Sequence, residues 1–193
     1  KKSIFSTIIS KRNILSQKIF KDAGFKIDKE DSDNIFLERP ISKISYKEVN
    51  KEHVKILYEL LKVRTHNISH NKMPDYEIHK QFVMSKPYKN WYVVFENDNP
   101  IGSFYIKEDN SIGINIENIF LSNLKDICGF IEKNFIPNKA IPSKVASCFS
   151  INVAESNKRL AKLLKDIGYE AIQTSFRVAK RVWKSNFYFC LMD

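Results

Sequence analysis

The stretch NWYVVFENDNPIGSFYIKEDNSIGINI, residues 90–116, decides the fold. Residues 91–95 are aromatic or β-branched, the residue types that fit a pleated, buried strand. Residues 96–100 form a turn, because Asn and Asp bond their own backbone and Pro100 has no N–H for a central strand. Residues 101–106 and 112–116 repeat the strand pattern on either side of a second polar turn. The stretch therefore predicts a three-stranded antiparallel meander.

Helical patterns flank the meander on both sides. Apolar residues at helical spacing predict upstream helices over residues 51–64, opened by the cap residue Asn50, and 76–85, stopped by Pro87. Downstream helices are predicted over residues 123–134 and from Glu155 to Gly168. The other predicted strands are residues 43–49, 144–153, 171–179 and 186–191. From residue 43 the order is β-α-α-β-β-β-α-β-α-β-β, an α/β (α+β) fold with a mixed central sheet.

The first 38 residues lie outside this order. Residues 3–10 and 25–27 are predicted as strands and residues 12–23 as a helix that stops at Gly24. Residues 28–34 are charged and predicted as a surface loop, and residues 35–37 as another extended piece. The sequence thus predicts an N-terminal β-α-β extension over residues 1–38 and a main domain over residues 39–193.

Length and composition set outer limits. A chain of 193 residues with 43% hydrophobic residues is expected to form one domain, or one domain with an appendage. No apolar run approaches the roughly 20 residues of a membrane helix, and no secretory leader is evident. The chain begins Lys1-Lys2 without Met, so we expect a processed product or a piece of a longer protein.

Charge and cysteine usage constrain the partners and the compartment. The formal net charge is +10, but the Lys residues are scattered and no RNA-recognition, zinc-finger or helix-turn-helix signature is present. We therefore do not expect a nucleic-acid partner. The three cysteines Cys128, Cys148 and Cys190 have neither CxxC nor metal-ligand spacing, which favours reduced thiols in the cytoplasm and no metal site.

The element order and several short motifs together resemble the GCN5-related N-acetyltransferase family. The resemblance covers about residues 44–193. Its late signature is an Asn at a helix start and Gly-Phe or Gly-Tyr at that helix's end, here Asn157 and Gly168-Tyr169. The other matching pieces are Trp91-Tyr92-Val93-Val94, Ile101-Gly102-Ser103, Ile112-Gly113-Ile114 and Ser150-Ile151-Asn152.

The resemblance implies a co-substrate, acetyl-CoA, wedged between two splayed parallel strands, residues 112–116 and 144–153. Backbone N–H groups of the first strand would hold the pantetheine arm and polarise the thioester carbonyl. The implied cofactor-binding residues are Ile114, Asn115, Ile116, Asn152 and Asn157, although Asn157 could equally be a helix cap.

The resemblance also implies an acceptor amine that loses a proton to a base before it attacks. Glu117, His70 and His79 are the candidate catalytic groups, and each has a plainer reading as a solvated carboxylate or a surface or core histidine. Tyr76, Tyr88 and Trp91 are candidate substrate-binding residues, or core aromatics. Residues 69–88 resemble a subgroup that modifies amino sugars or nucleotide sugars.

The chain departs from the family pattern in two places. The loop before the helix of residues 123–134 has no Gly, Lys or Arg, and it places Glu117 where the family binds the cofactor's pyrophosphate. Leu164 stands where the family often has a Tyr as general acid. A non-catalytic binding or scaffolding domain of a larger protein is therefore the alternative to an enzyme.

The N-terminal extension repeats the late signature. Asn13 and Gly24-Phe25 have the same spacing as Asn157 and Gly168-Tyr169. Residues 1–38 therefore resemble the end of a preceding acetyltransferase-like unit, or else form an ordinary capping unit with a coincidental Gly-Phe. A preceding domain or a homo-oligomer is the expected macromolecular partner.

Overall fold

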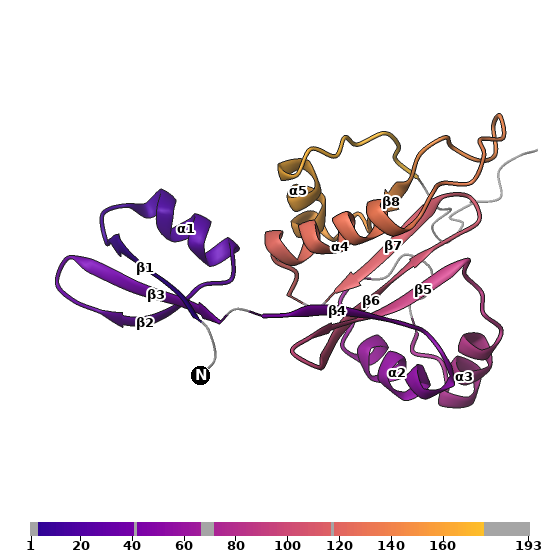
Figure 1. The fold of residues 1–193 in the computed structure, drawn as a ribbon, viewed down its shortest axis with the longest axis horizontal. Coiled ribbons are helices and arrows are strands. Elements are labelled where there is room, and N and C mark those ends of the chain that lie inside the picture. Colours follow the sequence, from indigo (N-terminus) through magenta and orange to yellow (C-terminus); the bar gives the residue numbers. More distant parts are fainter. Residues whose placement is uncertain (1–3, 41, 67–71, 117, 176–193) are drawn as a thin grey trace, which may run out of the picture.

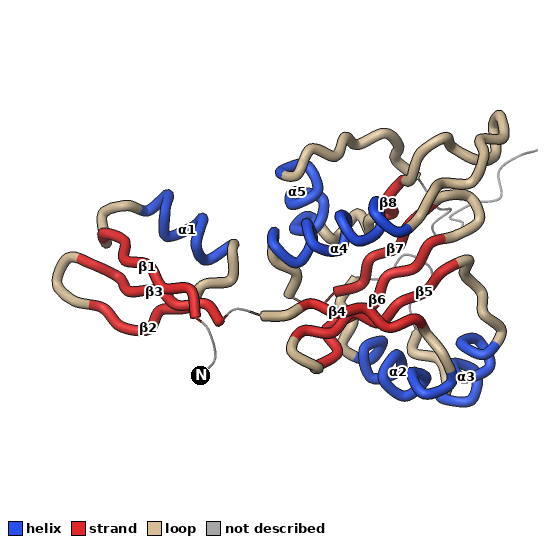
Figure 2. The backbone as a smooth tube through the Cα atoms, viewed as in Figure 1, coloured by secondary structure: helices blue, strands red, loops and turns tan. Residues whose placement is uncertain are grey.

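The computed structural model describes residues 4–40, 42–66, 72–116 and 118–175. Its larger part is a five-stranded mixed sheet with helices on both faces, so the predicted fold class is confirmed (Figure 1, Figure 2). The strand order is β4-β5-β6-β7-β8, in which the first four are antiparallel neighbours and β8 runs parallel to β7. The strands are β4 (Ile44–Glu48), β5 (Asn90–Glu96), β6 (Asn99–Ile106), β7 (Ser111–Ile116) and β8 (Ser150–Asn152).

Alternation along the meander strands divides the core between the two faces of the sheet. On one face, Val93 and Phe95 pack against α2 (Val54–Lys62), which follows the short turn η1 (Lys51–His53), and against α3 (Tyr76–Met84). On the other face, Val94 and Phe104 pack against α4 (Leu121–Asn134) and α5 (Lys158–Asp166). All the helices within the described residues are too short or too polar to cross a lipid bilayer.

The turn between β6 and β7 anchors the chain that leads into β8. Asn110 is fully buried, and its side-chain amide donates to the carbonyls of Asn138 (2.9 Å) and Ala146 (2.8 Å). Its side-chain oxygen accepts from the Asn138 N–H at 2.7 Å, and its own carbonyl accepts from the Ser150 N–H at 3.1 Å. The side chain of Asn110 thus fixes the long α4–β8 connection, and its backbone carbonyl fixes the start of β8.

The predicted strand over residues 144–153 is wrong over most of its length, since only Ser150–Asn152 pair with β7. The preceding residues satisfy their backbone in a different way: Ile141 and Val145 form an isolated bridge, and Asn110 holds Ala146. Residues 171–175 form no strand, and the rest of the two predicted C-terminal strands lies outside the described residues.

The N-terminal residues fold as a separate three-stranded sheet with one helix. Its elements are β1 (Ile4–Ser10), α1 (Ile14–Asp22), β2 (Lys26–Glu30) and β3 (Asn34–Pro40), with β3 in the middle of the sheet. Ile9, Ile35 and Leu37 form its small core. The predicted loop over residues 28–34 is therefore wrong at both ends, because β2 extends to Glu30 and β3 begins at Asn34. β2 is a fully exposed edge strand, so it shows no alternation of apolar residues.

Candidate functional site

The pairing between the parallel strands β7 and β8 ends early, and we call the region beyond this end the wedge. Their pairing joins Ser111 to Ser150 at one end and Gly113 to Asn152 at the other, and stops there. β7 continues to Ile116 and stays paired to β6 on its other side. The structure therefore brings four of the predicted cofactor-binding residues to this wedge: Ile114, Asn115, Ile116 and Asn152.

Asn157, the fifth of these residues, caps α5. Its side-chain oxygen accepts from the Leu160 N–H at 3.0 Å. That bond satisfies one of the free N–H groups at the start of the helix. The side chain thus has a structural partner within the described residues.

The N-terminal end of α4 carries a cation that comes from α5. Phe120 precedes α4 and offers no side-chain cap, and the first turn contains no acidic residue. Arg159 lies against this end: its Nε donates to the Ile119 carbonyl at 3.0 Å, and its guanidinium carbon lies 5.6 Å from the centre of the Phe120 ring. A helix N-terminus and a guanidinium together favour an anion.

An aromatic cluster covers the α2/α3 face of the sheet beside the wedge. The rings of Tyr88 and Tyr105 stack at 3.9 Å, and Trp91 meets Tyr88 edge-on at 5.0 Å. The Trp91 Nε1 is buried and has no hydrogen-bond partner among the described residues. A Cβ at position 113 would lie only 2.2 Å from the Tyr105 ring, so the glycine of β7 makes room for this stack.

Arg64 lies beside this cluster. Burial lowers the pKa of its guanidinium, while the nearby Tyr105 and Tyr88 act in the opposite direction. Its Nε donates to the His66 carbonyl at 2.7 Å, and His66 Nδ1 lies 3.0 Å from Ser156 Oγ. The segment after α2 is thus tied to the segment before α5.

Of the predicted substrate-binding residues, the structure brings Tyr88 and Trp91 together and places Tyr76 elsewhere. Tyr76 lies on α3, where its ring packs edge-on against Tyr58 at 5.1 Å. Sequence reasoning missed Arg64, Tyr105 and Arg159. The alternation of β6 could have identified Tyr105, because it puts this residue on the same face as Ser103 and opposite Trp91.

The three predicted catalytic residues do not form a described cluster. Glu117 and His70 lie outside the described residues. His79 is buried between α2 and α3, with Nε2 3.2 Å from the Val54 carbonyl and its ring 5.2 Å from that of Tyr58. This environment suits a packing role, so we do not include His79 in the reacting groups.

The burial of His79 makes the free energy of unfolding depend on pH. Burial lowers the pKa of His79 and of His53, so the unfolded chain binds protons that the folded chain does not. We expect the free energy of unfolding to fall as the pH drops below about 6.5, the ordinary value of the unfolded side chain. Urea unfolding between neutral pH and mild acid measures this slope, and His79→Gln should flatten it. An unchanged slope in His79→Gln would contradict the assignment.

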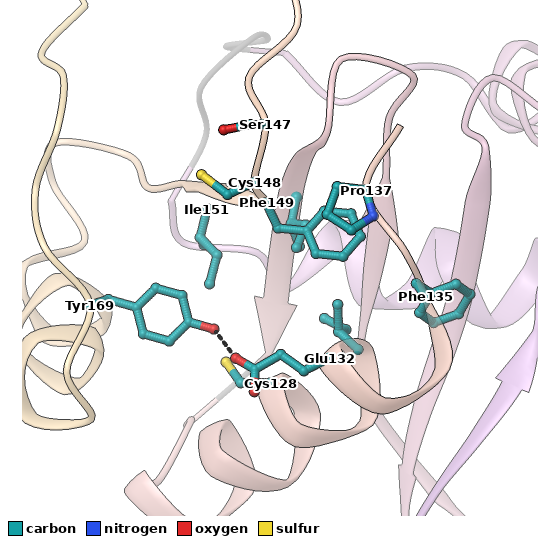
Figure 3. Close-up of a pocket in the computed structure, with 11 residues that line it drawn as sticks. Cys128, Glu132, Phe135, Pro137, Ser147, Cys148, Phe149, Ile151 and Tyr169 are labelled. Atoms are coloured by element: carbon teal, nitrogen blue, oxygen red, sulfur yellow. Dashed lines mark hydrogen bonds between the residues drawn. The ribbon is translucent and has the colours of Figure 1, made fainter. Parts of the chain in front are cut away.

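A separate cavity of about 370 Å³ lies on the α4/α5 side of the sheet (Figure 3). Tyr169 Oη donates to Glu132 at 3.0 Å across it, next to the Cys128 side chain. Burial raises the pKa of the Cys128 thiol, which keeps it protonated and poorly nucleophilic.

Comparison with known proteins adds information on the fold. No protein-family model matches the chain, and no curated protein matches it. A solved domain from Methanocaldococcus jannaschii aligns with a TM-score of 0.51 at 13% identity, over 69% of this chain and 92% of that one. The chain shares its fold with this archaeal domain.

Two further solved structures align at lower similarity. A possible acetyltransferase from Clostridium difficile aligns with a TM-score of 0.45 at 10% identity, over 72% of this chain and 98% of that one. A predicted acetyltransferase from Clostridium acetobutylicum, solved with acetyl-CoA, has a TM-score of 0.40 at 10% identity, over 71% of this chain and 96% of that one.

Proposed function

We propose that the chain is an acyl-CoA-dependent N-acetyltransferase that acts on a small-molecule amine. The observation that carries this proposal is the parallel pair β7–β8, whose pairing ends at Gly113 and Asn152 while β7 continues to Ile116. A gap between parallel strands leaves backbone N–H and C=O groups without a strand partner, and such groups must be satisfied by water or a ligand. The amide-rich arm of acetyl-CoA has the hydrogen-bonding groups to fill such a gap.

The ends of the wedge suit the two ends of that ligand. The free amides at the start of α4, together with Arg159, would hold its phosphates. Backbone groups of Ile114–Ile116 would hold the arm and polarise the thioester carbonyl. Bound acetyl-CoA supplies the activated acyl group.

The aromatic cluster would receive the acceptor. Tyr88, Trp91 and Tyr105 offer flat apolar surfaces, and Arg64 offers a cation at their border. A cation beside aromatic rings favours an acceptor that carries both a ring and a negative charge. Of the two acceptor classes that the sequence suggests, this favours a nucleotide sugar over a simple amino sugar.

A thermal shift with acetyl-CoA tests the proposal, with CoA and ADP as controls. A ligand at a hundred times its Kd stabilises the folded chain by about 2.7 kcal/mol. We expect acetyl-CoA and CoA to raise Tm clearly, because both carry the arm and the phosphates, and ADP to raise it less. The absence of a Tm shift at millimolar acetyl-CoA would reject the proposed acetyltransferase function.

A non-catalytic binding or scaffolding domain is the second candidate function. The lack of Gly, Lys and Arg over residues 117–123 favours it, because that loop has no residues suited to wrap a pyrophosphate. A Tm raised by acetyl-CoA without acetyl transfer to any amine in a broad screen, which would include nucleotide sugars, would select this alternative.

A further inference from the structure

The end of α1 lies against the start of α4, so the N-terminal unit (residues 4–40) touches the five-stranded part of the chain. Gly24 follows α1, and a Cβ built on it would lie 3.2 Å from Cγ of the Phe120 ring and 3.3 Å from both Cδ atoms. In Figure 1 the start of α4 is the end of that helix that points toward the N-terminal unit. Gly24 also has a φ of 85°, a conformation that favours glycine. A residue without a side chain thus suits this position on both counts.

The N-terminal unit holds Gly24 in place. Arg39 of β3 donates from its guanidinium to the Ala23 carbonyl at 2.8 Å. The Phe25 N–H donates to the Phe20 carbonyl at 3.0 Å, and the two rings pack edge-on at 5.1 Å beside the small core of the unit. The end of α1 therefore presents a fixed backbone surface to the start of α4.

Charge also links α1 to α5. The hydrogen bond to Asp166 is the largest cause that raises the pKa of the Lys162 ammonium, and the negative charge of Asp22 at the end of α1 adds to this rise. Lys162 stands one turn after Arg159 on α5. The N-terminal unit therefore lies beside α5 as well as beside the start of α4.

Phe120 connects this surface to the proposed phosphate site. We call the start of α4 together with Arg159 the α4 corner. The Arg159 guanidinium carbon lies 5.6 Å from the centre of the Phe120 ring, and Nε donates to the Ile119 carbonyl at 3.0 Å. The same ring contacts Gly24. A shift of the ring would therefore change the support of the cation, because a guanidinium is attracted to an aromatic ring beside it.

We propose that the N-terminal unit positions the α4 corner for the phosphates of acetyl-CoA. The end of α1 holds the Phe120 ring, and the ring and the Ile119 carbonyl hold Arg159 beside the free amides of α4. This inference rests on the proposed function and adds that the N-terminal unit controls the affinity of the site. Gly24 is a positioning residue, since it acts through Phe120 and Arg159. Because coupling between two binding events is reciprocal, bound acetyl-CoA would in turn strengthen the docking of the unit.

Gly24→Ala, with Gly168→Ala as the matched control, tests this role in the full chain. Gly168 stands at the same place after the nine-residue helix α5 and has a φ of 97°, but a Cβ built on it meets nothing within 4 Å among the described residues. Both substitutions thus share the strain of alanine at positive φ, and only Gly24→Ala displaces the Phe120 ring. By isothermal titration calorimetry we expect Gly24→Ala to raise the acetyl-CoA Kd about 3- to 10-fold and Gly168→Ala to change it less than about twofold.

A double-mutant comparison separates positioning from a general effect on stability. In Arg159→Ala, a further Gly24→Ala should change the Kd less than about twofold, because the cation that Gly24 positions is gone. Phe120→Leu keeps an apolar side chain but removes the flat ring, so it should weaken binding like Gly24→Ala without altering α1. Circular dichroism checks that each variant is folded.

Two outcomes would overturn the inference and leave the proposed function intact. In one, Gly24→Ala binds acetyl-CoA as tightly as the wild type; in the other, it weakens binding by the same factor in the wild type and in Arg159→Ala. Equal weakening by Gly168→Ala would likewise overturn the inference. A wild-type chain that does not bind acetyl-CoA would reject the proposed function, and with it the positioning role of Gly24.

Discussion

Asn110→Ala is expected to lower the free energy of unfolding by about 2–4 kcal/mol, because buried groups that lose their partner cost about 1–3 kcal/mol each. The substitution leaves the Asn138 N–H and the carbonyls of Asn138 and Ala146 without their side-chain partner. Ala146 is exposed, so water replaces part of the loss there. Urea unfolding at neutral pH measures the change.

Asn97→Ala is the matched control. Asn97 also lies in a hairpin turn at positive φ, with φ of 49° against 64° for Asn110, so the two substitutions share the backbone strain of alanine in that conformation. Its side chain makes one exposed bond, to the Lys43 N–H at 2.9 Å. We expect a loss of about 1 kcal/mol or less for this exposed bond. Equal losses at the two positions would contradict the anchoring role of Asn110.

In the proposed acetyl-CoA complex, Arg159→Ala is expected to weaken binding about 10- to 100-fold, the range of one or two charge-assisted hydrogen bonds. Arg159 is held at the start of α4 by its own bond to the Ile119 carbonyl, so its cation stays beside the free helix amides. Isothermal titration calorimetry at two salt concentrations measures the Kd, and the wild-type affinity should fall more steeply with salt than that of the variant.

Lys158→Ala removes the same charge one residue earlier and is the control. Lys158 is exposed and pairs with Glu155 in the same segment. We expect less than a threefold change in Kd, the size of an ordinary exposed charge contribution. If Lys158→Ala and Arg159→Ala weakened binding equally, general charge and not the α4 corner would account for the affinity.

The meander could be predicted because its signals are local. The turn residues at 96–100 and the alternation of β5 and β6 lie within a few positions of the contacts that they specify. The strand predicted over residues 144–153 failed because its pairing is decided by Asn110, far away in sequence. Residues 28–30, the charged end of β2, were predicted as loop because an edge strand with both faces exposed has no apolar period to read.

The candidate site was predictable only along β7 and β8. The sequence places Ile114, Asn115, Ile116 and Asn152 by strand position alone, and the structure brings them to one wedge. The sequence does not predict that Arg159 lies at the start of α4, because that contact depends on how α5 packs against α4. The loop before α4 has no basic residue of its own, but Arg159 of α5 lies beside it.

The early end of the β7–β8 pairing has an energetic consequence. Only three residue pairs join the two strands, so the last part of β7 has no hydrogen bonds to β8 that a ligand must break. Within the described residues, the arm of the proposed co-substrate would displace no strand there and would add to the sheet as a short extra strand. The edge of β7 beyond Gly113 is thus unpaired to β8 in the folded chain before any ligand binds. Binding would not have to break strand pairing at this edge, which lowers its free-energy cost.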